Sequence, residues 1–249
     1  MKIHKFTYFL LVLVFATLGV MTSARHQQTQ RDNAKENDYS KQLQARRLRF
    51  PTADYEETDL ADAKKNERLK QKKIRKNDFK FVARNPPYWQ TELVATNEGG
   101  MDFPALPIAQ STFIILGKIT SAEAHLSESK KNVYSEFKMV IEKVLKTANS
   151  SIIEGTELTV DRTGGFVKYP NGQSVLYRFS GMNMPLIGER YLFFLTSKDQ
   201  QDISILTAYE LGATVTPLDE SPQFEKYRGV TEDVFLQNLR DSLTKSSPY

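Results

Sequence analysis

The feature that most constrains the fold is a series of short apolar segments, separated by turn-forming residues, that begins near Leu106. The segments are rich in β-branched and aromatic residues and are shorter than ordinary helices, a combination typical of strands. Turn signals recur about every 8 to 12 residues, which favours a small barrel or sandwich over a parallel α/β sheet. The predicted strands are 113–120, 133–145, 157–160, 166–169, 175–179, 190–195 and 203–207, with an edge strand at 213–215.

Two local signals add detail to this prediction. The Asn171-Gly172 pair lies between two predicted strands and favours a tight hairpin turn. Near the end of the chain, Thr231 can cap a helix whose apolar residues, among them Phe235 and Leu239, recur on one face. We therefore predict a mainly β domain over residues 86–249 that closes with a C-terminal helix.

The first 24 residues have the pattern of a secretory signal peptide. Lys2 and Lys5 precede an apolar run over residues 6–20, and small residues lead up to Ala24. The run is shorter than the roughly 20 residues that span a bilayer. We expect cleavage after Ala24 and export to the periplasm or the extracellular space; the alternative is an uncleaved N-terminal membrane anchor.

Residues 25–85 form a polar, basic segment that we interpret as a stalk or linker. This segment has 17 Lys and Arg against 10 Asp and Glu, whereas residues 86–249 have 15 against 20. Residues 27–40 have the composition of a disordered spacer. From Asp54 to Lys76 the charge changes from acidic to basic, which suits a helix dipole, but few apolar residues are available for burial. We therefore expect a charged helical or disordered stalk, and we expect residues 25–76 to be dispensable for folding.

The basic excess suggests two kinds of partner for the stalk. A lysine cluster is a candidate for weak contact with a membrane surface or another polyanion; it comprises Lys70, Lys72, Lys73 and Lys76. Nucleic acid is not favoured, because the basic residues lie in a polar segment rather than on a folded face. After the stalk, Pro86-Pro87-Tyr88-Trp89 predicts a rigid strap that packs on the domain, and an exposed aromatic ligand patch is the alternative.

The composition excludes several kinds of chemistry. With no cysteine, the chain has neither disulfides nor a thiol nucleophile nor a cysteine zinc site. Of the three histidines, His125 alone lies in the predicted domain, so a catalytic zinc site and a Ser-His-Asp triad are disfavoured. We expect His125 to be a solvated loop or strand-end residue. Phosphate-loop, dinucleotide and EF-hand motifs are absent from the sequence, and we expect no cofactor.

One polar cluster is a candidate ligand site. Two arginines, a Gly-Gly turn and an asparagine could form an anion-binding rim at one end of the barrel. The candidate binding residues are Arg162, Gly164, Gly165, Arg178 and Asn183. The alternative is that these arginines form ordinary ion pairs with Asp161 or Glu189 and that the glycines serve the turn.

Several motifs in the domain resemble a known group of proteins. They are Ile115–Ile119, Tyr134–Phe137, Val144–Lys146, Gly164-Gly165 and Gly188–Leu195. In these motifs the chain is similar to exported bacterial domains of unassigned function, which in turn resemble the OB-like barrel of netrin modules and tissue inhibitors of metalloproteinases. The resemblance implies a small OB-like antiparallel barrel over about residues 106–215. Those inhibitors chelate zinc through an N-terminal cysteine, which this chain lacks, so their mechanism is not implied.

These observations favour an exported, monomeric, non-enzymatic binding or envelope-interaction module, whose partner is an envelope protein or a polyanion. A carboxylate-based hydrolase of an extracytoplasmic polymer, with Asp161 and Glu189 as acid and base, is the first alternative. A structural scaffold that acts through its stalk is the second.

Overall fold

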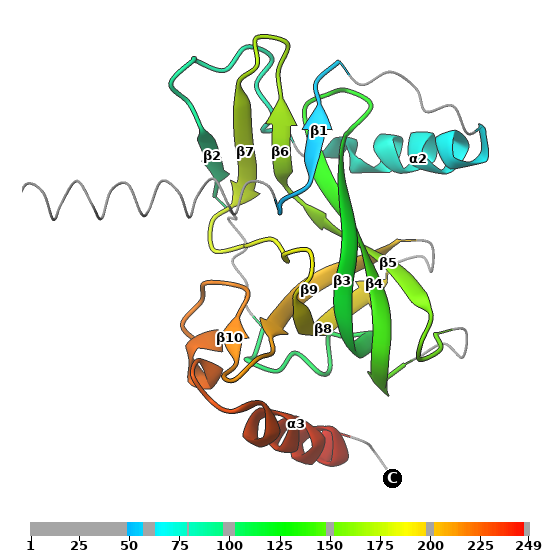
Figure 1. The fold of residues 1–249 in the computed structure, drawn as a ribbon, viewed down its shortest axis with the longest axis vertical. Coiled ribbons are helices and arrows are strands. Elements are labelled where there is room, and N and C mark those ends of the chain that lie inside the picture. The colour runs from blue at the N-terminus through cyan, green and yellow to red at the C-terminus, as the bar shows by residue number, and fades with distance from the viewer. Residues whose placement is uncertain are drawn as a thin grey trace, which may run out of the picture. The chain divides into compact units, whose positions relative to one another are not determined.

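The centre of the computed structural model is a ring of five strands (Figure 1). Around the ring the hydrogen-bonded order is β3-β4-β5-β9-β8, and β8 pairs again with β3. All of these pairs are antiparallel except β5 with β9. The bounds are β3 Phe113–Leu126, β4 Val133–Lys146, β5 Glu157–Thr163, β8 Arg190–Ser197 and β9 Ile203–Glu210, and a short β10, Thr216–Pro217, extends the sheet beside β9. The predicted mainly β, barrel-like fold is therefore confirmed.

The structure describes residues 49–56, 63–78, 80–96, 103–147, 152–197 and 202–246. The predicted signal peptide, residues 1–24, and the predicted spacer, residues 27–40, lie outside these ranges. One compact unit extends from Phe50 to Tyr249. Among the helices in the described ranges, none has the length and apolar character needed to cross a membrane.

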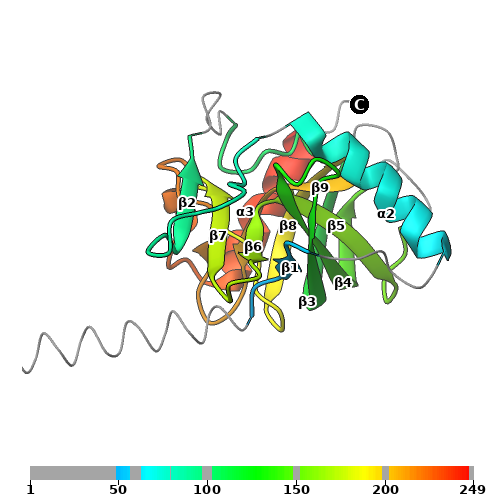
Figure 2. The same ribbon diagram turned by 90° about the horizontal axis from the view of Figure 1, so that it is seen from above.

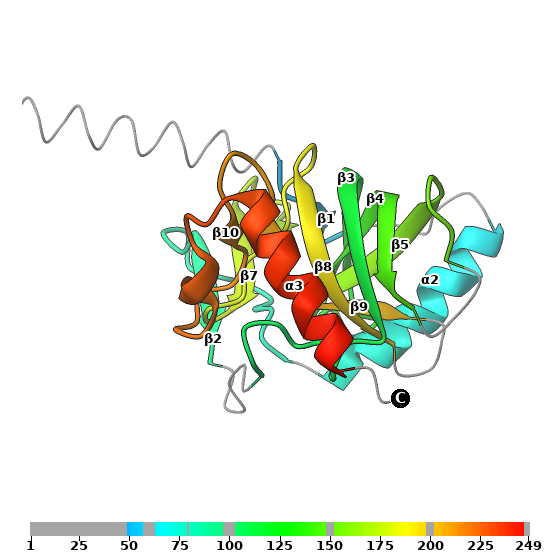
Figure 3. The same cartoon turned by 90° about the horizontal axis from the view of Figure 1, so that it is seen from below.

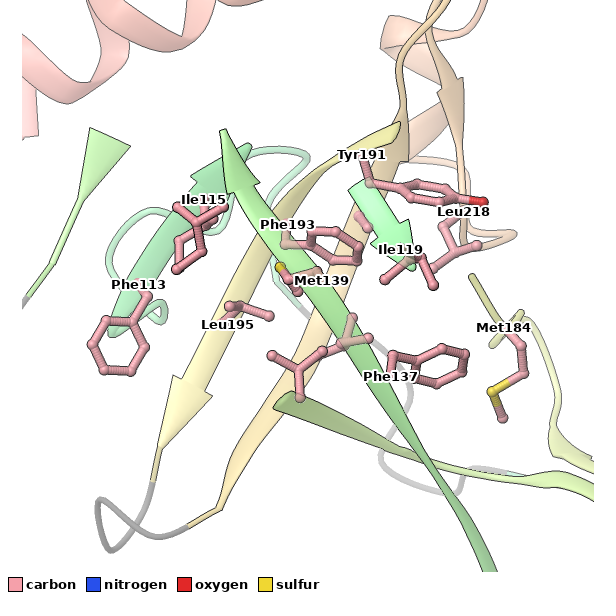
Figure 4. Packing of buried hydrophobic residues seen from close by; sticks show 14 residues of the cluster. Phe113, Ile115, Ile119, Phe137, Met139, Met184, Tyr191, Phe193, Leu195 and Leu218 are labelled. Atoms are coloured by element: carbon pink, nitrogen blue, oxygen red, sulfur yellow. The ribbon is translucent and has the colours of Figure 1, made fainter. Parts of the chain in front are cut away.

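The barrel core follows from the alternation of side chains along the strands. In β4, Phe137, Met139 and Ile141 are almost fully buried, and they meet side chains from the other four ring strands in one cluster. Figure 4 shows Phe137 and Met139 among Phe193, Leu195 and Ile119. Because successive side chains point to opposite faces of a strand, the alternate residues of β4, including Glu136, lie on the outer face.

The outer face of β3 and β8 packs against the C-terminal helix. Helix α3, Glu232–Ser246, and the short 3-10 helix η2, Phe224–Tyr227, contribute Phe235, Leu239 and Phe224 to a second apolar cluster with Ile114 and Phe194. Figure 3 shows α3 lying across β8. Burial on both faces explains the continuous apolar runs at residues 113–116 of β3 and 191–195 of β8. The predicted C-terminal helix is confirmed.

A second sheet has the order β1-β6-β7-β2. Its strands are β1 Thr52–Asp54, β6 Gly165–Lys168, β7 Ser174–Phe179 and β2 Glu92–Ala95. The hairpin predicted at Asn171-Gly172 is confirmed, because β6 and β7 pair antiparallel and Gly172 has a φ of 83°. The outer strands β1 and β2 pair in parallel with their neighbours.

The described part of the predicted stalk, residues 50–56, 63–78 and 80–85, contributes both a strand and a helix to the compact unit. Strand β1 pairs with β6, and helix α2, Ala63–Arg75, followed by η1, Lys76–Asp78, lies beside β4 and β5 (Figure 2). Leu69 on α2 is only 3% exposed. A helix is present over part of the predicted range, because Asp54 lies in β1 and α2 begins at Ala63. This helix packs on the barrel, so we expect deletion of residues 50–76 to destabilise the fold.

Gly164 allows a close approach between the two sheets. Its φ is 116°, and a Cβ placed there would clash with Cε of Met184 and lie 2.7 Å from the carbonyl oxygen of Tyr177. Gly172 also has a positive φ, but a Cβ there would meet nothing within 4 Å.

We predict that Gly164→Ala lowers the free energy of unfolding by roughly 3 kcal/mol, since it adds a steric clash to an unfavourable dihedral angle. Gly172→Ala, the matched control, adds only the dihedral cost of about 1 kcal/mol. Urea unfolding of both variants measures the difference, and equal losses would contradict the close approach at Gly164.

Candidate functional site

The candidate site is an open hollow with a volume of about 610 Å³. Its walls come from three segments that are distant in the sequence: the end of β1, a strap formed by residues 80–91, and the hairpin tip formed by residues 127–132 between β3 and β4. The lining residues are Tyr55, Lys80, Val82, Arg84, Glu128, Ser129, Lys130 and Lys131.

The hairpin tip is a hydrogen-bonded turn. The backbone N–H of Ser127 donates to Asn132 O at 2.9 Å, and the N–H of Lys130 donates to Ser127 O at 2.9 Å. Lys130 has a φ of 54°, a left-handed conformation that is uncommon outside glycine. This turn holds Lys130 and Lys131 at the end of two long strands.

The strap is fixed to the domain by backbone hydrogen bonds. The N–H groups of Phe81 and Val82 both donate to Lys131 O, at 2.8 and 2.9 Å. The Tyr169 hydroxyl donates to Ala83 O at 2.7 Å. Because alternate residues of an extended chain share one side, Lys80, Val82 and Arg84 all line the hollow.

The hollow is strongly cationic. Lys80, Arg84, Lys130 and Lys131 are exposed, and Glu128 is the single carboxylate among the lining residues. Lys130 Nζ donates to Tyr55 O at 2.7 Å and lies 5.2 Å from the centre of the Tyr55 ring. Within the described ranges, the other three cations make no ion pair with a carboxylate of the chain. They therefore remain available to an external anion.

Helix α2 is attached to the barrel by ion pairs rather than by a large apolar face. Lys72 Nζ lies 2.8 Å from Oε1 of Glu136 on β4 and 2.7 Å from Oδ2 of Asp161 on β5. Arg68 binds both oxygens of Glu136, at 3.2 and 2.8 Å. Lys76 adds a second contact to Asp161, at 3.1 Å.

The C-terminal end of α2 positions the hairpin tip. The Glu128 N–H donates to Lys73 O at 3.2 Å, and the Ser129 N–H donates to Oδ1 of Asn77 at 3.0 Å. Asn132 Nδ2 donates to Lys76 O at 2.8 Å. The docked helix thus supports one wall of the hollow.

The buried charges under α2 stabilise one another in the ionised state. Burial would raise the pKa of Glu136, but the charge of Lys72 and the hydrogen bonds from Arg68 outweigh it and lower this pKa to about 2. Burial would also lower the pKa of Lys72, but Asp161 and Glu136 outweigh it, and the net shift is upward. Removing one member of such a group leaves an uncompensated buried charge, which is strongly destabilising.

His125 lies near the end of β3, as predicted, but it is buried under the same helix, whereas the sequence suggested a solvated residue. It is 2% exposed, because β3 continues to Leu126 and α2 covers this part of the sheet. Its Nε2 lies 3.8 Å from Oε2 of Glu136, and its ring centre lies 5.5 Å from that of Tyr134.

The five residues predicted to form an anion-binding rim do not share an open site. Arg162 is almost fully buried and pairs with Asp219 at 2.5 Å, and the Asn183 N–H also donates to Asp219. Arg178 pairs separately with Glu92 at 2.5 Å. The Gly164 N–H donates to Val133 O, and Gly165, on β6, pairs with Tyr177 on β7. A solvent anion cannot reach Arg162 in this arrangement.

The predicted lysine cluster and the predicted hydrolase carboxylate also differ in the structure from what the sequence suggested. Lys72 and Lys76 of the proposed membrane-contact cluster are engaged by barrel carboxylates, while Lys70 is exposed. Asp161, one of the two carboxylates proposed for a hydrolase, is 1% exposed and is held by Lys72 and Lys76. It is therefore covered rather than presented in a cleft.

Tyr88 and Trp89 are exposed, whereas the sequence favoured packing against the domain. Their exposed fractions are 89% and 70%, and they are the only aromatic side chains in the described ranges with such exposure. Their exposure agrees with the alternative given by the sequence, an exposed aromatic patch, rather than with packing on the domain.

Comparisons of the chain with protein-family models, curated proteins and solved structures found no match. The resemblance to exported netrin-like domains stays a prediction. Among the described residues, no group of three or more histidines and carboxylates is arranged to hold a metal ion. The site is consequently interpreted from its own chemistry.

We predict that α2 docking weakens in acid. The folded-state pKa of Glu136 is about 2, below its ordinary value of 4.5, so its contribution is complete above about pH 5 and is lost as the pH falls toward 2. The free energy of unfolding, measured in urea from pH 7 to pH 2, should fall across this window. Glu136→Gln should be less stable at pH 7 and should show a shallower decrease; an unchanged slope would contradict the assignment.

Proposed function

We propose that this protein is an exported, non-enzymatic binding module that holds an anionic ligand in the cationic hollow. The observation that carries this proposal is the convergence of four exposed basic side chains on one hollow of about 610 Å³ with a single carboxylate. Export is proposed from the signal-peptide pattern of residues 1–24.

The geometry of the hollow favours an anion. A concave surface lined by charges of one sign concentrates the electrostatic potential and raises the local concentration of oppositely charged ligands. Arg84 provides a planar fork of donors that fits phosphate, sulfate or carboxylate, while the lysines act as point charges. Hydrogen bonds hold the backbone of the strap and of the hairpin tip, so binding must order the basic side chains but not the backbone that carries them.

The lining residues favour binding over catalysis. Glu128 is the one carboxylate in the hollow, and the lining contains no histidine. General acid–base chemistry on a glycosidic bond needs two carboxyl groups at a defined separation. The alternative function, a carboxylate hydrolase, needs Asp161 in an open cleft. Because α2 covers Asp161, the arrangement favours a binding module.

The experiment measures the affinity of the mature protein for inorganic polyphosphate by calorimetry. We predict that the double variant Lys80→Ala/Arg84→Ala binds at least about tenfold more weakly, because it removes two charge-assisted contacts. The matched control, Lys118→Ala/Lys138→Ala, removes the same charge from exposed positions on β3 and β4 and should bind within about twofold of wild type.

We call Lys80→Ala/Arg84→Ala the hollow variant. Higher salt should weaken the wild-type complex more than the complex of the hollow variant, because the wild type makes more charge contacts with the ligand and screening by salt weakens each of them. Equal affinities of the hollow variant and the control variant would overturn the proposed function.

A further inference from the structure

We propose that the ligand of the hollow is an acidic oligosaccharide, whose charged groups bind in the hollow while neighbouring sugar rings stack on Tyr88 and Trp89. This inference rests on the proposed function and names the class of ligand. It is carried by the position of the aromatic pair on the same strap that supplies Lys80 and Arg84.

The strap presents the two aromatic side chains on a fixed turn. The Gln90 N–H donates to Pro87 O at 2.9 Å, so Tyr88 and Trp89 occupy the centre of a four-residue turn. Gln173 Nε2, from the β6–β7 turn, donates to Pro87 O at 2.7 Å and to Gln90 O at 2.8 Å. Both ends of the turn are thus anchored to the domain while the two rings remain in solvent.

Chain geometry limits the distance between the two parts of the site. Arg84 and Tyr88 are four residues apart, so their Cα atoms are separated by at most about 14 Å. A ligand of a few linked sugar rings can cover this distance. The arrangement suits an extended polymer segment better than a single small ion.

The two surfaces fit different faces of a sugar. A pyranose ring offers a face of C–H groups, which packs on an exposed aromatic ring, and its carboxylate or sulfate group accepts hydrogen bonds from arginine and lysine. Polyphosphate has charge but no apolar face. The Tyr55 ring inside the hollow is stacked on Tyr169 at 5.0 Å and is covered by Lys130, so Tyr88 and Trp89 provide the accessible aromatic surface.

An anionic membrane also attracts aromatic and basic residues. The cations here line a concave hollow, however, and the flat surface of a bilayer does not enter such a space. The shape therefore favours a soluble or polymer-borne sugar chain over a lipid surface.

Trp89 is the single tryptophan of the chain, so its fluorescence reports directly on this contact. The probes are a uronic-acid hexasaccharide, its carboxyl-reduced neutral form, inorganic polyphosphate of equal charge, and vesicles of anionic lipid. We expect the hexasaccharide to shift the Trp89 emission to shorter wavelength and to bind at least tenfold more tightly than polyphosphate and the neutral form.

Two variants separate the contributions. Tyr88→Ala/Trp89→Ala should weaken hexasaccharide binding, measured by calorimetry, at least about tenfold and leave polyphosphate binding within twofold. Lys80→Ala/Arg84→Ala should weaken both. Val234→Ala, at an exposed apolar position on α3, is the control and should change neither affinity.

The outcomes distinguish the two proposals. If the aromatic variant binds the hexasaccharide as wild type does, the oligosaccharide inference is wrong, while the anion site stands. If the hollow variant binds both anions as wild type does, the proposed function itself is wrong. Tight vesicle binding that depends on Tyr88 and Trp89, without hexasaccharide binding, would replace the sugar by a membrane surface.

Discussion

The ammonium group of Lys72 lies between the carboxylates of Glu136 and Asp161, and the arrangement of the site depends on this contact. It attaches to the outside of the barrel a helix that, from residue 67 onward, has one deeply buried apolar side chain, Leu69. The end of that helix then bonds to the hairpin tip, which forms one wall of the hollow. Because buried charges tolerate little displacement, the contact fixes the helix in one position even where its net contribution to stability is modest.

Within its described residues, the compact unit contains two kinds of charged surface, one with paired charges and one with unpaired cations. Acidic side chains on the outer face of β4 and β5 are neutralised internally by α2, whereas Lys80, Arg84 and Lys131 pair with no carboxylate in the part of the chain that the structure describes. These carboxylates of β4 and β5 are therefore occupied by α2 and do not neutralise the cations around the hollow. A surface that keeps its cations unpaired around a hollow is suited to bind an external anion.

The sequence predicted the barrel strands, the Asn171-Gly172 hairpin and α3, because alternation, turn chemistry and an apolar helix face are local signals. It did not predict the docking of α2, since a basic helix face is usually solvated. The spacing of Arg68, Lys72 and Lys76, each one helical turn from the next, together with an outward-facing Glu136, was the available signal. The hollow was missed because its walls meet through long-range contacts: the pairing of β1 with β6 places Tyr55, and the hydrogen bonds from Phe81 and Val82 to Lys131 O join the strap to the hairpin tip. The predicted rim failed to assemble because Arg162 points to Asp219 in the interior.

The central claim is that the hollow binds an anion, and backbone amide chemical shifts test it most directly. During titration of the isotope-labelled protein with the uronic-acid hexasaccharide, the account predicts saturable shifts concentrated at residues 80–84 and 128–131. Amides of α3, on the barrel face that packs against β8, should not move. Shifts confined to α3, or an absence of saturable shifts at the strap and the hairpin tip with every anion tested, would contradict the account.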